Sequence, residues 1–294
     1  MKINPLLALT WVIAPIFSAS AATTSTFNGL PSDTPVTLQA FGDPGGPSIN
    51  PNGGFTGAGD GGLVVTPAVN GQNNYATFNR TNTGTFSSSS FSFQFRVGLG
   101  TTAGTADGVA FAYLPSSTFG ISGPIGAAPF GAAEDPSAAG VLGFGLDTWS
   151  NNGSIAAPPG DPASPDDPNQ AQGSNYSEIS LFYNGTLINR VNDTRLLPVP
   201  FALDDGNWHT AFGTVNFAGQ NVSMTVDNTV IWNNIPVPGL TSFEARIAYA
   251  GRTGGENEIF NVDNVNVDWI PIPEPASAAF GLLGLGLILR RRRK

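Results

Sequence analysis

Residues 91–97 have the sequence Phe-Ser-Phe-Gln-Phe-Arg-Val, in which apolar and polar side chains alternate. An alternation of period two is typical of a β-strand that buries one face and exposes the other. The segment therefore predicts a strand whose phenylalanines point into a core. The same period recurs at 109–113, 179–183, 222–226 and 265–269, so we expect several half-buried strands.

Turn signals separate these segments. Asn184-Gly185 lies between two alternating runs and predicts a tight hairpin turn, and Asp227-Asn228 predicts a second reversal. No long segment has helical periodicity, and residues 152–175 are rich in proline and aspartate, which indicates a long loop. Many strands without helical crossovers predict an all-β fold, an antiparallel sandwich built as one domain.

The composition excludes some functions. Between the two apolar ends the chain has six arginines and no lysine against 20 acidic residues, a net charge of about −14. Such a surface argues against binding nucleic acid through its phosphates and favours the binding of cations. The chain has no cysteine, so it has neither disulfides nor a thiolate metal site.

The N-terminal residues have the layout of a secretory signal peptide. Lys2 precedes the apolar residues 6–17, and small residues follow at 19–21. We expect signal peptidase to cleave after Ala21, which makes residues 1–21 a signal peptide. The alternative is a buried N-terminal strand.

The C-terminal residues 271–294 form a second targeting segment. Pro273-Glu274-Pro275 precedes 14 uncharged residues and a final cluster of four arginines and a lysine. The apolar run would extend about 21 Å as a helix, short of the roughly 30 Å of a bilayer core. The cluster would hold that end in the cytoplasm.

This tail resembles the PEP-CTERM sorting signal of Gram-negative bacteria. The resemblance implies transient association with the inner membrane, removal of the tail by an exosortase-type membrane protease, and delivery to the cell surface or extracellular matrix. The alternative is a permanent anchor with a stop-transfer charge cluster.

Residues 22–270 resemble the L-type lectins, the legume-like group with a concanavalin A-like jelly roll. The resemblance rests on separated pieces that occur in the family's order: 62–66, 75–78, the strand at 91–97, 106–111, 144–151, 207–209 and 246–255. It implies a jelly-roll sandwich of antiparallel sheets that binds polysaccharide or another glycan.

The most specific candidate functional site in the sequence is a calcium site. Asp147, the carbonyl of Trp149 and Asn151 provide oxygen ligands two residues apart, which suit a hard cation such as Ca²⁺. In L-type lectins this pattern holds calcium. A further acid must come from the next loop, where Asp161, Asp166 and Asp167 are available; we favour Asp167. The alternative is a polar strand end without a metal.

A second, transition-metal site is not expected. Gly145 stands where the plant lectins have a glutamate, and Glu178 stands where they have a histidine. Members of the family that bind calcium alone also lack this second site.

The resemblance also implies a sugar site. Its centre is Asp107, which would follow a cis Ala106-Asp107 peptide bond and accept hydrogen bonds from two sugar hydroxyls. Asn151 would donate to the sugar as well as bind calcium, and backbone amides at Gly254 and Gly255 would close the pocket. The aromatic wall usual in sugar sites could come from Trp149 or Phe130. Asp107-Gly108 could equally form an ordinary turn.

Catalysis is not expected. His209 is the only histidine, and no serine or cysteine arrangement supports a triad, so we expect it to be packed and hydrogen-bonded. Glycoside hydrolases share the jelly roll, but the paired-carboxylate spacing of its glucanases is absent. Glu256 and Glu258 share one face of an extended segment, where we expect solvated acids.

These observations predict an exported, calcium-supported lectin that catalyses no reaction. Two alternatives stay open: a structural matrix protein on the same fold that does not bind sugar, and a glycoside hydrolase that uses Glu256 and Glu258.

Overall fold

The computed structural model describes residues 21–41, 45–101, 104–126, 133–150 and 177–272. The predicted signal peptide (its first 20 residues), Phe130, Asn151, Asp167 and the sorting tail from Pro273 onward lie outside these ranges. No helix among the described residues is long and apolar enough to span a membrane.

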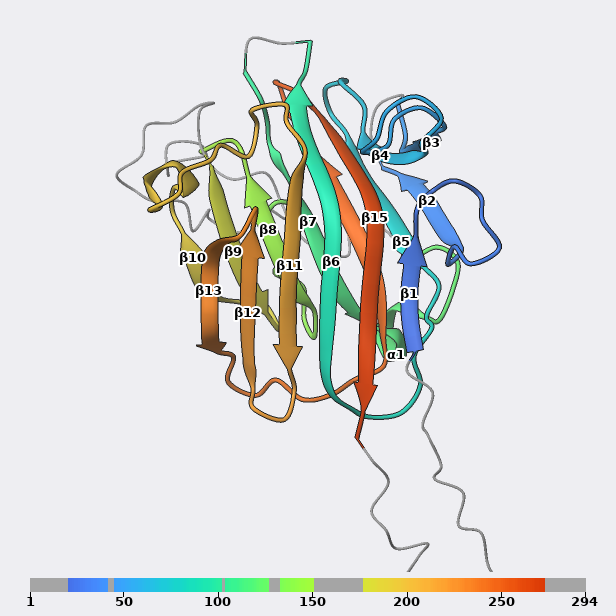
Figure 1. The fold of residues 1–294 in the computed structure, drawn as a ribbon, viewed down its shortest axis with the longest axis vertical. Coiled ribbons are helices and arrows are strands. Elements are labelled where there is room, and N and C mark those ends of the chain that lie inside the picture. The colour runs from blue at the N-terminus through green and yellow to red at the C-terminus, as the bar shows by residue number, and fades with distance from the viewer. Residues whose placement is uncertain (1–20, 42–44, 102–103, 127–132, 151–176, 273–294) are drawn as a thin grey trace, which may run out of the picture. The chain divides into compact units, whose positions relative to one another are not determined.

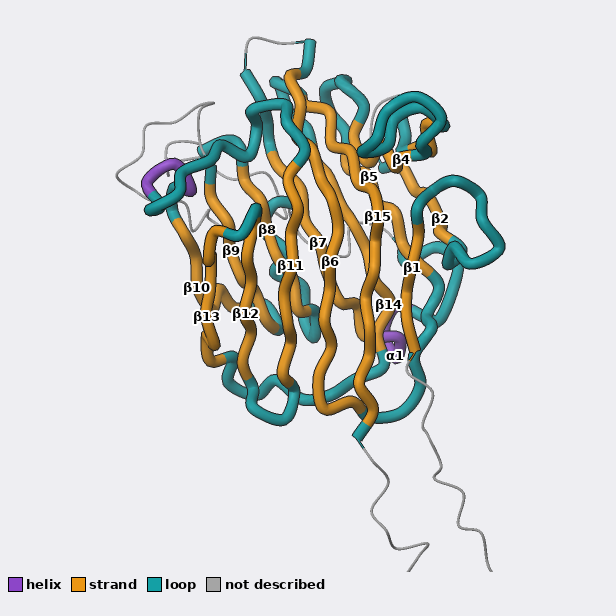
Figure 2. The backbone as a smooth tube through the Cα atoms, in the orientation of Figure 1, coloured by secondary structure: helices purple, strands orange, loops and turns teal. Residues whose placement is uncertain are grey.

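Two antiparallel β-sheets make up the described unit, which runs from Ala21 to Ile272 (Figures 1 and 2). The all-β prediction is confirmed. The first sheet has eight strands in the order β13-β12-β11-β6-β15-β4-β3, with β1 beside the later half of β15. The second has seven strands in the order β10-β9-β8-β7-β14-β5-β2.

The strand bounds of the eight-stranded sheet are β1 Ala21–Ser25, β3 Ser48–Asn50, β4 Gly62–Thr66, β6 Phe86–Leu99, β11 His209–Asn216, β12 Asn221–Val226, β13 Thr229–Pro236 and β15 Glu258–Pro271. Those of the seven-stranded sheet are β2 Val36–Ala40, β5 Asn73–Phe78, β7 Gly108–Pro115, β8 Leu142–Asp147, β9 Glu178–Tyr183, β10 Thr186–Val191 and β14 Ala245–Arg252. The described helices are one short α-helix, α1 Ser116–Phe119, and one 3₁₀ turn, η1 Thr194–Leu196.

The strand at 91–97 lies at the centre of the fold, as predicted. It belongs to β6, where Phe91, Phe93 and Phe95 are almost completely buried while Ser92 and Gln94 are half-buried on the outer face. Both predicted turns are confirmed as well, because Asn184-Gly185 and Asp227-Asn228 have positive φ angles and join paired strands.

An aromatic cluster joins the two sheets. The Phe111 ring of β7 lies 4.9 Å from Phe91 and 5.0 Å from Phe93, both on the facing strand β6. On its own sheet it lies 5.6 Å from Phe144 and 5.4 Å from Tyr249. These separations are in the range of favourable aromatic pairs, so the cluster stabilises the contact between the sheets.

The prediction of a half-buried strand at 109–113 is wrong. All eight residues of β7 are buried. Ala112 and Leu114, on the face turned away from the aromatic cluster, belong to a second core with Ile125 and Val141. Described residues that follow α1 thus cover the part of the outer face of the seven-stranded sheet that lies over β7.

The two ends of β15 lie at opposite ends of the sandwich. Glu258 begins the strand beside Leu99 of β6, and Trp269 near its end pairs with Ala21 of β1. The strand has 14 residues, so these ends are roughly 43 Å apart at about 3.3 Å per residue. The chain therefore enters and leaves the described unit at the same end, far from Glu258.

We predict that Phe111→Ala lowers the free energy of unfolding by about 3–5 kcal/mol, because it leaves a cavity between the sheets. Phe212→Ala is the matched control, since Phe212 is 50% exposed on the outer face of β11. Urea denaturation of both variants measures the difference. An equal loss in both would contradict this account of the core.

Candidate functional site

The candidate site lies at the edge of the sandwich where β7 begins and where β8 and β14 end. Gly108, the first residue of β7, pairs with Asp147 of β8 and with Arg252 of β14. The strand register thus brings Asp107, the residue before β7, to the ends of both neighbouring strands.

Asp107 is held by its backbone on both sides. Its amide donates to the Arg252 carbonyl at 3.0 Å, and its carbonyl accepts from the Thr148 amide at 3.2 Å. The Ala106-Asp107 peptide bond is cis, as the lectin resemblance implies. The Asp107 side chain is 11% exposed, so it is largely buried at this edge and a small part of it reaches solvent.

The late loop after β14 lies against Asp107 at Gly254. A Cβ atom added to Gly254 would lie 2.9 Å from the Asp107 Oδ2 atom, so a side chain there would crowd the carboxylate. A Cβ atom on Gly255 would meet nothing within 4 Å. The loop therefore approaches the Asp107 carboxylate closely at Gly254 and leaves open space at Gly255.

Buried polar side chains fix this loop. Thr253 donates through its hydroxyl to the Val69 carbonyl at 2.6 Å, and its own amide donates to the Gln72 carbonyl at 3.0 Å. Asn257 accepts from the Thr101 amide at 2.7 Å and donates to Asn70. The loop at Gly254 is thus held by hydrogen bonds on both flanks.

Arg252 and Glu134 form an ion pair next to Asp107 that sequence reasoning missed. Arg252 donates to both carboxylate oxygens of Glu134, which is 1% exposed, and its Nε atom lies 3.6 Å from Asp107 Oδ2. The sequence offers no signal for this pair, because Glu134 and Arg252 are 118 residues apart.

The predicted metal ligands are described in part. Asp147 ends β8 and is 2% exposed, and its Oδ1 atom accepts from the Trp149 amide at 2.8 Å. Trp149 is half-buried. Asn151 and Asp167 lie outside the described residues, so the complete ligand set stays a prediction.

Gly145 has a packing reason to be glycine. A Cβ atom there would lie 1.9 Å from the Glu134 carbonyl oxygen, so this strand cannot carry a glutamate at that position. Glu178, which pairs with Asp147 across β8 and β9, is 1% exposed and lies 3.7 Å from Arg190. Both residues have structural roles that need no transition metal.

Glu258 corrects one expectation. It is completely buried rather than solvated, because its Oε2 atom accepts from the Thr148 hydroxyl at 2.6 Å beneath the site. Its Oε1 atom has no hydrogen-bond partner among the residues that the structure describes. Burial raises the pKa of Glu258 to about 8; the Thr148 hydrogen bond opposes the rise, and the negative charge of Asp107 adds to it.

The burial of Glu258 also weighs against the hydrolase alternative. Glu256 lies before β15 in the loop, where it accepts from the Gly104 amide at 3.2 Å, while Glu258 begins the strand and points inward. The two carboxylates therefore occupy different environments, one at the surface and one beneath Thr148.

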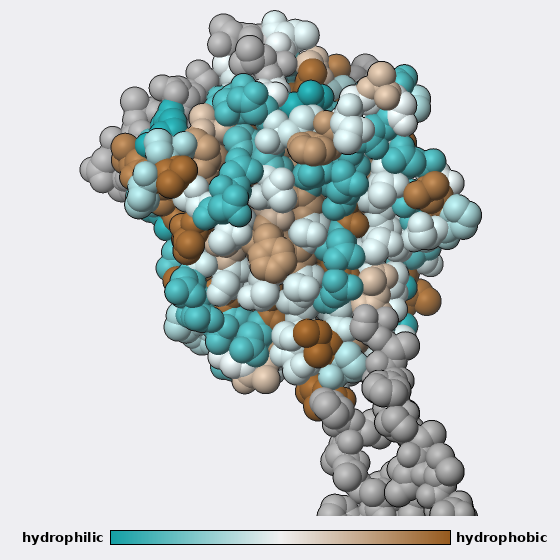
Figure 3. Space-filling view, in the orientation of Figure 1, coloured by the Kyte–Doolittle hydropathy of each residue, from teal (hydrophilic) through white to brown (hydrophobic). Residues whose placement is uncertain are grey.

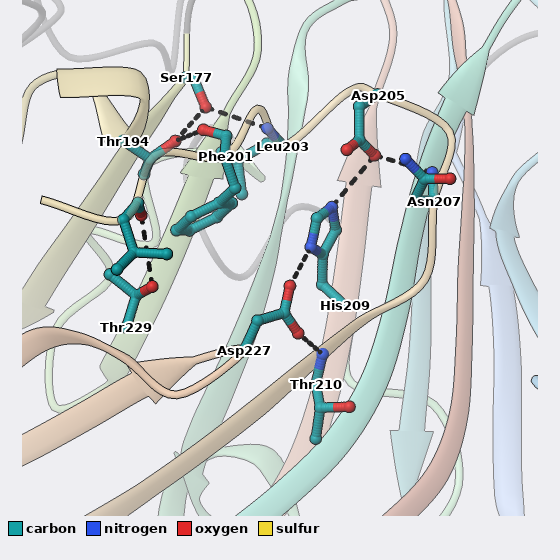
Figure 4. Close-up of polar contacts among 11 residues, drawn as sticks. Ser177, Thr194, Phe201, Leu203, Asp205, Asn207, His209, Thr210, Asp227 and Thr229 are labelled. Carbon is teal, nitrogen blue, oxygen red and sulfur yellow. Dashed lines mark hydrogen bonds and ion pairs between the residues drawn. The ribbon is translucent and has the colours of Figure 1, made fainter. Parts of the chain in front are cut away.

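His209 is packed and hydrogen-bonded, as predicted. It is 3% exposed and lies between two carboxylates, with Nδ1 2.6 Å from Asp227 and Nε2 3.2 Å from Asp205 (Figure 4). Asp227 also accepts from the Thr210 amide at 2.8 Å. The histidine thus ties the loop before β11 to the turn between β12 and β13.

Comparison with solved structures decides the fold family. A peanut lectin with a bound nine-residue peptide has a TM-score of 0.56 at 13% sequence identity, over 87% of this chain and 100% of the lectin chain. A Bauhinia forficata lectin in complex with GalNAc has a TM-score of 0.53 at 14% identity, over 86% and 99%. A Lotus tetragonolobus seed lectin has a TM-score of 0.52 at 16% identity, over 87% and 100%.

The chain has the legume-lectin fold. No known protein family and no curated protein matches the sequence itself. At these identities the likeness establishes the lectin fold, and any function has to be argued from the site.

We predict that Glu258→Gln changes how stability depends on pH. Because the folded pKa lies above the ordinary value of 4.5, the folded state keeps a proton that the unfolded chain releases. The stabilisation from Glu258 is therefore complete below about pH 4.5 and is lost as the pH rises toward 8. Glu258→Gln should flatten this decline.

Melting temperatures at pH 5 and pH 8, measured in a chelator, test this prediction. Glu256→Gln is the matched control and should keep the wild-type decline, because Glu256 is only half-buried. An unchanged decline in Glu258→Gln would show that Glu258 is charged in the folded protein.

Proposed function

We propose that this protein is an exported, calcium-supported lectin that binds carbohydrate at the Asp107 edge and catalyses no reaction. The observation that carries the proposal is the convergence of Asp107, Gly254 and the end of β8 at one edge of a lectin fold. The Bauhinia forficata lectin, which has this fold, binds GalNAc.

Asp107 is suited to recognise sugar hydroxyls. Hydrogen bonds fix its backbone on both sides, and its carboxylate can accept two hydrogen bonds from adjacent hydroxyls. The open space beside Gly255 leaves room for the ring, and Trp149 could supply an apolar wall. Asn151 would add an amide donor.

The local charge favours a bound cation. Asp107, Glu134 and Asp147 are buried at this edge, and Arg252 lies against both Asp107 and Glu134. Buried negative charge in excess of positive charge is costly unless a proton or a metal compensates it. A calcium ion would supply that compensation and fix the strand end.

The oxygen donors fit calcium. The Asp147 carboxylate and the Trp149 carbonyl are hard oxygen ligands at one strand end, and Asn151 and Asp167 would complete the set. We propose no second, transition-metal ion.

The proposed processing involves the segments on either side of the described unit. Strand β15 ends at Pro271, at the end of the sandwich opposite Glu258 and the Asp107 edge. The proposed processing is cleavage by signal peptidase after Ala21 and by an exosortase-type protease near Pro273-Glu274-Pro275.

Glycan-array binding tests the lectin proposal. The wild-type protein should bind at least one glycan in calcium and lose the signal in a chelator, and Asp107→Asn should abolish binding because it removes a hydroxyl acceptor. Asp268→Asn is the matched control on the outer face of β15, far from the site, and should bind like wild type. Calcium uptake without glycan binding would favour the structural matrix protein instead.

The proposed sorting predicts the mass of the surface protein. Mass spectrometry of protein collected from the cell surface should find a C-terminus near Pro275, without Arg290 and the residues after it. An intact arginine cluster on surface-localised protein would show that the tail is a permanent anchor.

A further inference from the structure

A hollow of about 250 Å³ lies on the outer face of the eight-stranded sheet, and Asp107 is not among its lining residues. It is lined by Arg96 and Gly98 of β6, Ile259 and Asn261 of β15, and Asp205 and Gly206 of the loop before β11. This sheet faces the viewer in Figure 3, where its surface is mostly hydrophilic or neutral, with scattered apolar residues.

The missing side chain of Gly98 opens the floor of the hollow. A Cβ atom at Gly98 would lie 3.8 Å from the Ile259 carbonyl oxygen and 3.9 Å from its Cβ atom, which are ordinary contacts. The strand could therefore carry a side chain here, and the space above Gly98 is not required by the packing of the sheet.

Arg96 has hydrogen-bond donors to spare. Its Nε and Nη2 atoms donate to Asn261 Oδ1 at 3.3 and 3.0 Å, which leaves three of its five N–H groups. Among the described residues Arg96 forms no ion pair, whereas Arg80, Arg190, Arg195 and Arg252 each pair with a carboxylate. Its guanidinium is thus oriented by an amide without being neutralised.

The opposite wall offers an acceptor in a fixed place. Asp205 Oδ1 accepts from the Asn207 amide at 2.7 Å and lies 3.2 Å from His209 Nε2, as Figure 4 shows. The Asp205 side chain is 31% exposed, so its carboxylate can be reached by a ligand from solvent. The Gly206 amide donates to the Val97 carbonyl at 3.1 Å, so this wall is also tied to β6.

An aromatic side chain stands beside these polar groups. The Arg96 guanidinium lies 5.0 Å from the centre of the Trp208 ring, in a cation–π arrangement. Phe55 packs edge-on against Trp208, with 6.0 Å between ring centroids, and is 43% exposed. The hollow therefore combines a donor, an acceptor and apolar or aromatic surface.

This combination selects a neutral, polyhydroxylated ligand. A cation would be repelled by Arg96, and an anion would meet both Asp205 and the strong negative charge of the domain. A sugar ring satisfies all the groups, because its hydroxyls accept from Arg96 and donate to Asp205 while its C–H face packs on apolar surface. The volume suits one ring rather than a longer ligand.

We propose that this hollow is a second carbohydrate subsite, which binds one neutral sugar ring of a polysaccharide through Arg96 and Asp205. It adjoins the Asp107 edge through β15, because Glu258 points inward to Thr148 while the next residue, Ile259, lines the hollow. The subsite needs no metal.

Binding in a chelator tests the proposal separately from the calcium-supported site. The protein expressed from the full chain is titrated in EDTA with cellohexaose, maltohexaose, mannohexaose and galactohexaose, and binding is followed by saturation-transfer NMR and calorimetry. At least one hexaose should bind. Gly98→Val, which fills the hollow from its floor, should weaken that binding by about tenfold or more.

Ser90→Val is the matched control, because Ser90 lies on the same face of β6 outside the hollow, and it should change binding by less than about twofold. Arg96→Ala provides a second test and should also weaken binding if Gly98→Val fails to fold. The proposal is overturned if no hexaose binds in EDTA, or if these variants bind like wild type. Either result would leave the proposed calcium-dependent glycan binding at Asp107 intact. The experiment therefore distinguishes a failure of the subsite proposal from a failure of the lectin proposal.

Discussion

The pairing of β7 with its two neighbours is the constraint on which the candidate site depends. Gly108 pairs with both Asp147 and Arg252, so three segments distant in the sequence end at one edge. A register shift of one residue would turn Asp107 to the other side of the sheet. The aromatic cluster around Phe111 resists such a shift, because it locks β7 against the facing sheet.

Charge is the second organising factor at this edge. The fold buries Asp107, Glu134, Asp147 and Glu258 at this edge, where Arg252 contacts Asp107 and Glu134. Two effects reduce this buried negative charge. Glu258 retains a proton to about pH 8, and a cation at Asp147 would offset the charge of the remaining carboxylates. The proposed calcium is thus a consequence of the packing as well as of the ligand chemistry.

Sequence reasoning was successful where a signal is local. Alternation located β6, Asn184-Gly185 located a hairpin, and the short motif at Asp107 located the edge of the site. It failed where the outcome depends on distant residues. Alternation could not show that the chain after α1 covers β7, and nothing near Glu258 indicates that Thr148, 110 residues away, buries it.

The central claim is that the end of β8 holds the ion that supports sugar binding at Asp107. Anomalous diffraction from crystals grown in calcium tests it most directly. The account predicts one peak within about 2.3–2.6 Å of an Asp147 carboxylate oxygen, with the Trp149 carbonyl and Asn151 among its ligands. Crystals in which that strand end holds no ion at saturating calcium would contradict it.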